Sequence, residues 1–297
     1  MILITGGTGK IGKALVKDLQ TRGVPFRLMV RNEETRAVLD KQGIQNVPGD
    51  FTSPGSFPTA LAGIKQVFLL TAPHPDGASL ENAFLDASRK AGVQRVVRIS
   101  AMGANPWSAS PLLSIHGRCE AQLEASGLGW TILRPTMFMQ NLALIYGESV
   151  AKTSTLFAPA GEARIPWIDC RDIAELAAVC LTSAGHEGMV YEITGAQAHS
   201  YSEVCEQLSA CLGRTIKYVD VPDDAAYHAM LNMGMTGWFA HALITLFHQF
   251  RADRGLSVCL GTYPRIVGRP CRTLESYLQE NLDVFRGVKA PSLTHSS

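Results

Sequence analysis

The chain has 297 residues, of which 46% are hydrophobic and 18% are charged, so it can bury a large core and disorder is not expected. Lys and Arg number 27 against 26 Asp and Glu, and the net charge of +1 provides no broad positive field. We therefore expect no nucleic-acid partner and no binding to an acidic membrane surface.

Two features indicate a cytoplasmic protein. The seven cysteines lie mostly inside apolar helical patterns without a CxxC pair, so we expect them to be reduced packing residues. The residues after Met1 show no basic segment followed by an apolar core and a cleavage site. The longest apolar stretch, 233–250, contains two glycines and two histidines, which is too polar for a membrane-spanning helix.

Short apolar segments alternate with helical patterns over the first two thirds of the chain. The expected strands are Ile2–Thr5, Phe26–Val30, Gln45–Val47, Val67–Thr71, Arg95–Ser100, Trp130–Leu133, Ala163–Ile168 and Val190–Thr194. The expected helices are Ile11–Arg22, Glu34–Lys41, Ser53–Ala62, Gly77–Ala91, Leu112–Ser126 and one that begins at Asp169. This alternation predicts an α/β fold, a Rossmann-type doubly wound parallel sheet with helices on both faces.

The pattern becomes mostly helical after the last of these strands. The expected elements are helices at Tyr201–Leu212, Ala225–Met235, 236–250 and Thr273–Phe285, with one short strand at Ile216–Val221. We therefore predict a Rossmann domain over 1–194, a smaller, mostly helical lobe over 195–285 that covers the carboxyl edge of the sheet, and a flexible tail over 286–297.

A glycine-rich turn, Gly6-Gly7-Thr8-Gly9-Lys10-Ile11-Gly12, joins the first strand to the first helix. In this context Gly6 permits the sharp turn, Gly9 lets the backbone approach a pyrophosphate, and Gly12 lets the helix pack closely. The free N–H groups of the helix attract the phosphates, so we expect Gly6, Thr8, Gly9, Lys10 and Ile11 to contact a dinucleotide. The alternative is a tight turn that binds no ligand.

The second strand ends at Val30-Arg31-Asn32, where a dinucleotide-binding fold selects between NAD(H) and NADP(H). No acid is present there to accept the 2′-hydroxyl of the adenosine ribose. The guanidinium of Arg31 suits a 2′-phosphate, and Lys10 would add a second positive charge beside it. This favours NADP(H), although Arg31 can equally be an ordinary solvated loop residue.

Other strand ends supply further candidates for the coenzyme site. We expect Asp50 and Phe51 near the adenine, with Asp50 as an acceptor for the exocyclic amine or as an acid at a helix start. Thr71, Ala72 and Pro73 should wall the nicotinamide ribose, because ligands lie outside the carboxyl ends of the strands. Ser100 is a contact for ribose or substrate, or a cap of the next turn. The backbone of Pro135 to Phe138 should meet the carboxamide, and we expect Phe138 to shape the pocket, with packing alone as the alternative.

With these residues in order, the chain resembles the NmrA-like branch of the atypical short-chain dehydrogenases/reductases. The resemblance runs from Met1 to about Phe285, and its more specific segments are Leu133 to Asn141 and Gly268 to Thr273. It implies the fold and NADP(H) as coenzyme. The family includes quinone reductases, triphenylmethane dye reductases, alkaloid reductases acting on iminium carbons, and redox-sensing regulators that bind NADP(H) without known turnover.

One departure from the wider family bears on mechanism. Most short-chain dehydrogenases use a Tyr-x-x-x-Lys pair, in which the tyrosine protonates the carbonyl oxygen. Alignment on the usual helix puts Leu112 at the tyrosine position and His116 at the lysine position. Because leucine cannot donate a proton, we expect hydride transfer to an acceptor that needs little acid help. His116 and Ser100 are the catalytic candidates. We expect His116 to hold the coenzyme ribose or to relay a late proton, and the alternative is a solvated residue on the helix surface.

The leading hypothesis is an NADPH-dependent reductase of a small electron-poor molecule, such as a quinone, an iminium ion or a conjugated cation. The alternatives are an NADP(H)-sensing regulator that acts through protein partners and an isomerase or lyase that keeps the coenzyme bound. We expect no metal, since His241 and His248 lack a matching carboxylate or cysteine. The apolar stretch at 236–250 is either core, a homodimer face, or a wall for a hydrophobic, aromatic substrate together with Met230, Met233 and Met235.

Overall fold

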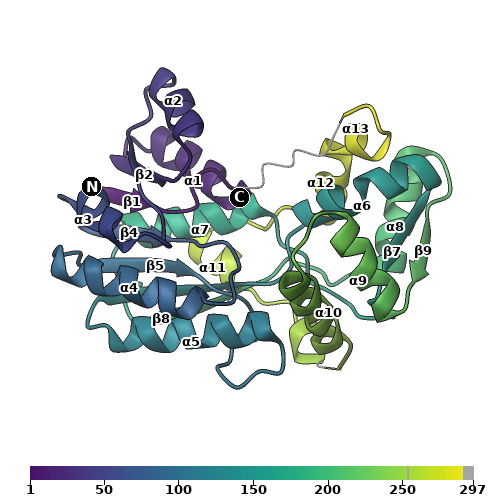
Figure 1. Cartoon of the computed structure of the whole chain (residues 1–297). Coiled ribbons are helices and arrows are strands. Elements are labelled where there is room, and N and C mark those ends of the chain that lie inside the picture. Colours follow the sequence, from purple (N-terminus) through teal and green to yellow (C-terminus); the bar gives the residue numbers. More distant parts are fainter. Residues whose placement is uncertain (253, 290–297) are drawn as a thin grey trace.

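The computed structural model describes residues 1–252 and 254–289, and Figure 1 shows that they form two lobes. The first lobe is built on a seven-stranded parallel sheet with the order β3-β2-β1-β4-β5-β6-β8. Its strands are β1 (Ile2–Ile4), β2 (Phe26–Val30), β3 (Asn46–Pro48), β4 (Gln66–Leu69), β5 (Arg95–Ile99), β6 (Gly129–Pro135) and β8 (Met189–Ile193). The predicted Rossmann-type sheet is therefore confirmed. The strand order reverses between β1 and β4, and ligands of doubly wound sheets bind beyond the carboxyl ends of the strands at such a point.

Helices cover both faces of this sheet and bury two apolar cores. One core packs α1 (Lys10–Thr21), α7 (Cys170–Thr182) and α11 (Thr262–Val267) on the sheet. The other packs α3 (Phe57–Leu61), α4 (Gly77–Lys90) and α5 (Pro111–Ala125) on the opposite face. The 3₁₀ turn η1 (Pro54–Ser56) precedes α3, and α2 (Glu33–Lys41) follows β2 with Asn32 as its cap. The strands are buried on both faces, which explains their nearly continuous apolar sequences.

The second lobe is mostly helical and has its own core. Its helices are α6 (Gln140–Thr153), α8 (Tyr201–Leu212), α9 (Asp223–Asn232), α10 (Gly237–Ala252), α12 (Leu274–Glu280) and α13 (Leu282–Phe285), with the 3₁₀ turn η2 (Arg254–Ser257). Strands β7 (Thr155–Ala158) and β9 (Lys217–Asp220) pair in parallel. This core joins residues 139–167 to residues 201–285. The boundary at residue 194 stays a prediction.

The sequence-based assignment differs from the structure around residues 140–168. No strand forms over Ala163–Ile168, where only single bridges join Ile165 to His199 and Ile168 to Phe138. The physical reason is Pro166, which has no N–H to donate to a ladder, and the Trp167 N–H bonds locally to the Ile165 carbonyl at 3.0 Å. Helix α6 and strand β7 were not predicted. In the expected tail, residues 290–297 lie outside the described part.

The apolar stretch of α10 mainly packs inside the second lobe. Phe247 and Phe250 are buried in its core together with Met230 of α9, whereas Met233 is 49% exposed. The Nε2 atom of His248 lies 2.6 Å from the Asp223 carboxylate. Among the described residues, none of the helices combines the length and hydrophobicity that a membrane crossing needs.

Candidate functional site

The glycine turn leads from β1 into α1 and shapes the start of that helix. Gly6 has a positive φ of 62°, and its carbonyl accepts the Gly9 N–H at 3.0 Å. A Cβ on Gly12 would lie 2.2 Å from the Gly6 carbonyl oxygen, so only glycine lets the helix begin directly against the turn. No side chain caps α1, and its first turn carries no acid. Its N-terminal N–H groups are thus available to an anion, which fits the pyrophosphate of a dinucleotide.

Some side chains of this turn pack in the core, and others make polar contacts. Ile11 is buried in the core beneath α1, so only its backbone N–H is available to a ligand, while Thr8 is half-buried. The ammonium of Lys10 donates to the Gln140 carbonyl at 3.3 Å, and burial lowers the Lys10 pKa. Lys10 is therefore engaged at the start of α6. The structure does not show it beside a phosphate at the end of β2, where the sequence argument put it.

The residues expected near the adenosine lie after β2 and β3. Arg31 is exposed and has no hydrogen bond or ion pair with any residue in 1–252 or 254–289, so its guanidinium is free for a ligand. One oxygen of Asp50 accepts the Thr52 N–H at 2.9 Å, and its second oxygen stays available. Phe51 packs against Phe84 with a centroid distance of 5.0 Å, which fixes the loop against the core.

A buried polar chain begins at the end of β4. The Thr71 hydroxyl donates to Glu81 of α4 at 2.6 Å. The same carboxylate accepts two hydrogen bonds from Arg98 of β5, at 2.7 Å from Nε and 3.2 Å from Nη2. Arg98 Nη2 also lies 3.3 Å from Nδ1 of His116 on α5. This series of hydrogen bonds therefore connects Thr71, a residue of the predicted ribose wall, to His116, the predicted catalytic histidine.

The environment of His116 keeps its ring neutral. Burial and then the positive charge of Arg98 lower the His116 pKa to about 3, although Glu81 opposes this. Burial also raises the pKa of the neighbouring Cys119 thiol to about 12. Neither group is a proton donor of the usual kind at neutral pH. His116 is not the solvated surface residue of the alternative interpretation, because it is half-buried and contacts Arg98.

Ser100, the second catalytic candidate, is held by a separate pair of charges. Its hydroxyl donates to Glu120 of α5, and Ser100 is buried. Glu120 in turn accepts hydrogen bonds from Arg134 of β6, at 3.0 Å from Nε and 2.5 Å from Nη2. The hydroxyl hydrogen of Ser100 is therefore committed to a carboxylate, which leaves only its oxygen to meet a ligand.

The remaining candidates follow β4 and β6 at the same edge of the sheet. Ala72 and Pro73 are exposed beyond the end of β4. The carbonyl of Pro135 accepts the Met102 N–H at 2.9 Å, so it is already used inside the protein. Phe138 is half-buried against the core that carries α1 and α7. This favours packing for Phe138, and the structure brings all four residues to the carboxyl edge.

Sequence reasoning did not assign roles to the four charged residues that organise this site, Glu81, Arg98, Glu120 and Arg134. One observation pointed to two of them, since Arg98 and Arg134 interrupt strands that are otherwise apolar. A charge inside a buried strand requires a partner. The partners themselves were not predictable, because they lie on helices 14 to 17 residues away.

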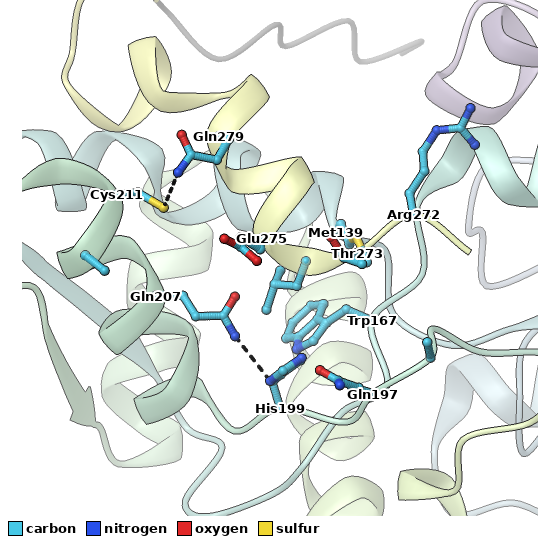
Figure 2. A pocket seen from close by; sticks show the side chains of 13 residues that line it. Met139, Trp167, Gln197, His199, Gln207, Cys211, Arg272, Thr273, Glu275 and Gln279 are labelled. Carbon is cyan, nitrogen blue, oxygen red and sulfur yellow. Dashed lines mark hydrogen bonds between the residues drawn. The ribbon is translucent and has the colours of Figure 1, made fainter. Parts of the chain in front are cut away.

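A separate cleft of about 440 Å³ lies between α8, α12 and the loop after β8. Figure 2 shows Trp167, His199 and Gln207 side by side in its wall. The Trp167 indole N–H is buried without a partner in the described residues, and Gln207 Nε2 lies 3.4 Å from His199 Nδ1. None of the predicted site residues lines this cleft.

The comparisons with known proteins agree with this geometry. The profile of the NAD(P)H-binding family matches residues 6–183, which include the glycine turn and the ends of β2 to β6. The chain belongs to this NAD(P)H-binding family. This member is an oxidoreductase that binds NAD(P)H.

Relatives of this oxidoreductase are aligned over nearly its whole length. The NAD(P)H azoreductase of Xenophilus azovorans is 37% identical, with 96% of this chain and 99% of that protein aligned. The (4-alkanoyl-5-oxo-2,5-dihydrofuran-3-yl)methyl phosphate reductase of Streptomyces griseus is 30% identical, with shares of 96% and 99%. An NADPH-dependent quinone oxidoreductase of Escherichia coli, solved with NADPH, has a TM-score of 0.84 at 26% identity and covers 95% of this chain and 99% of its own.

Proposed function

We propose that this protein is an NADPH-dependent reductase of small electron-poor molecules, in which no Tyr–Lys pair takes part. The acceptor class comprises quinones, iminium ions and conjugated systems such as azo compounds. One observation carries this proposal: the two catalytic candidates, Ser100 after β5 and His116 on α5, hold no proton that they can release at neutral pH. His116 is uncharged, and Ser100 is bonded to a carboxylate. Helix α5 contains neither tyrosine nor lysine.

When bound, NADPH supplies the hydride, and the chain supplies position and charge. The N–H groups at the start of α1 hold the pyrophosphate, and Arg31 holds the 2′-phosphate of the adenosine. Thr71 is fixed by Glu81, so the end of β4 forms a rigid wall beside the nicotinamide ribose. The proton that balances the reduction comes from water, because the site offers no side-chain acid.

Without a side-chain acid, the site favours acceptors that can stabilise the negative charge that arrives with the hydride. A simple ketone gains an alkoxide-like oxygen on reduction and needs an acid at that oxygen. A quinone, an iminium ion or a conjugated azo compound spreads or cancels the incoming charge, so it reacts without one. The names of two relatives, an NAD(P)H azoreductase and an NADPH-dependent quinone oxidoreductase, support this class of acceptor.

The test is to mix the purified protein and NADPH with quinones, azo dyes, cyclic iminium ions and cationic dyes, and to follow the absorbance of the reduced nicotinamide. Unactivated ketones serve as the matched control. We expect oxidation of NADPH with members of the first group and none with the ketones. Tight binding of NADPH without turnover of any of these compounds would contradict the reductase and favour a coenzyme-sensing protein.

A further inference from the structure

The hydrogen bonds around Arg98 restrict the chemistry of His116. Arg98 is 1% exposed and sits between two helices, with Glu81 of α4 on one side and His116 of α5 on the other. A guanidinium stays protonated and can only donate. The nitrogen that faces it, Nδ1 of His116, must therefore act as the acceptor.

A neutral imidazole has one proton, and this contact decides where it lies. With Nδ1 occupied as an acceptor, the proton is on Nε2. The other titratable groups that face the ring do not change this, since Glu81 is paired with Arg98 and the Cys119 thiol keeps its proton. The ring is thus held as a single tautomer with its N–H directed away from Arg98.

The Nε2 edge of His116 is open. The Nε2 atom makes no hydrogen bond with any residue in 1–252 or 254–289. Buried side-chain atoms without a partner occur elsewhere in these residues, but Nε2 is not one of them, so it is accessible to a ligand. The same network reaches the carboxyl edge of the sheet, because Thr71 at the end of β4 donates to Glu81. His116 therefore lies near the carboxyl edge of the sheet, and it carries an uncharged N–H that no protein group accepts among the residues that the structure describes.

We propose that Glu81 and Arg98 are positioning residues that fix His116 as an uncharged Nε2–H donor, which hydrogen-bonds an oxygen or nitrogen of the bound coenzyme or acceptor. Only the identity of the bound molecule rests on the proposed reductase function. The donor gives no proton away. It orients the ligand, and it stabilises charge that develops on the atom that it contacts.

The tautomer is tested without any turnover. In protein labelled with ¹⁵N at histidine, the two His116 ring nitrogens are assigned by the signals that disappear in His116→Gln. We expect Nδ1 to be unprotonated and Nε2 to be protonated throughout pH 5 to 8. A protonated Nδ1, or a doubly protonated ring near pH 6, would overturn the proposal. Glu81→Gln should shift these signals towards a mixture of tautomers, and unchanged signals would remove Glu81 from the positioning role.

The donor role is tested by two matched substitutions. The amide N–H of His116→Gln reaches the position of Nε2, whereas that of His116→Asn reaches only the position of Nδ1. We expect Gln to retain most function and Asn to lose about ten-fold, as His116→Ala does, because a neutral hydrogen bond contributes that much. Equal losses for Gln and Asn would contradict the donor geometry. Thermal unfolding of each variant verifies that the fold is kept.

Two readouts distinguish the ligand. Weaker NADPH binding in His116→Asn, measured by calorimetry, assigns the hydrogen bond to the coenzyme. Unchanged NADPH binding with a lower kcat/KM for the acceptor assigns it to the acceptor. No change in either quantity for His116→Ala would overturn the proposal. If no acceptor is reduced at all, the reductase function fails, while the nitrogen signals and the NADPH titration still decide the role of His116.

Discussion

Arg98 and Glu81 form a two-point ion pair inside the first lobe, with side chains only 1% and 4% exposed. Each charge has given up its water and depends on the other for compensation. Arg98 Nη1 has no partner among the described residues, so the loss of Glu81 would leave the whole guanidinium poorly satisfied. The pair is thus a point where the fold and the site depend on the same contact.

Glu81→Ala should lower the free energy of unfolding by about 3–5 kcal/mol, because it leaves a buried positive charge unpaired. Urea unfolding at pH 7 measures this loss. Glu148→Ala is the control, since its pair with Lys152 is exposed and its removal should change stability very little. A comparable loss of unfolding free energy in the two variants would show that the buried ion pair contributes no more to stability than the exposed one.

Arg31→Ala should weaken NADPH binding about 10- to 100-fold and leave NADH binding nearly unchanged, because a charge-assisted hydrogen bond contributes about 1.5–3 kcal/mol. Calorimetric titration with both coenzymes measures the difference. Arg22→Ala, at the far end of α1, is the control and should affect neither. A similar loss for NADPH and NADH would refute the contact with the 2′-phosphate.

Gly12→Ala should abolish coenzyme binding, since the new Cβ would meet the carbonyl oxygen of Gly6 at 2.2 Å and force the turn away from α1. Equilibrium dialysis with NADPH checks this. Gly55→Ala provides the matched control, because a Cβ there meets nothing within 4 Å. Binding of NADPH at the level of the parent protein in Gly12→Ala would contradict the role of the close approach.

His116 should make the fold sensitive to mild acid. Burial and Arg98 lower its pKa from 6.5 to about 3, so below pH 6.5 the unfolded chain binds a proton that the folded chain refuses. Stability is complete above pH 6.5 and falls by about 2 kcal/mol between pH 6.5 and 5 from this residue. Urea unfolding at several pH values, compared with His116→Gln, isolates the effect. Parallel pH profiles for the two proteins would exclude it.

Ser100→Ala should reduce stability by about 1 kcal/mol and leave kcat almost unchanged, because Glu120 keeps both hydrogen bonds from Arg134. Steady-state kinetics with a quinone or azo acceptor measures the second quantity. A large drop in kcat with normal NADPH binding would instead assign a catalytic contact to the Ser100 oxygen.

Local sequence patterns were sufficient for most of the first lobe. The strand Phe26–Val30 and the helix Tyr201–Leu212 have the predicted bounds, since period and capping residues are local properties. The glycine turn was interpretable for the same reason. The region of α6 and β7 was not, because β7 is a strand only through its pairing with β9, about 60 residues further along the chain.

The sequence indicated where the candidate residues lie in the fold. It did not indicate which groups their side chains contact. The sequence put the candidate residues at strand ends, and the structure brings those ends to one edge because the strands are parallel, while the roles of the residues stay predictions. Which group each would contact depends on helix packing, so the engagement of Lys10 with Gln140 and of Ser100 with Glu120 was not foreseeable. The neutral state of His116 follows from Arg98, which only the tertiary fold brings near it.

The way the backbone passes between the lobes has a consequence for dissecting this molecule. The second core needs residues 139–167 as much as residues 201–285, and α11, which belongs to the later range, covers the sheet of the first lobe instead. A fragment that starts at residue 195 would lack the β7 partner of its own β9 strand and the buried Trp167. Neither half is therefore a separable module, and exchange of substrate specificity between relatives calls for grafting several discontinuous segments at once.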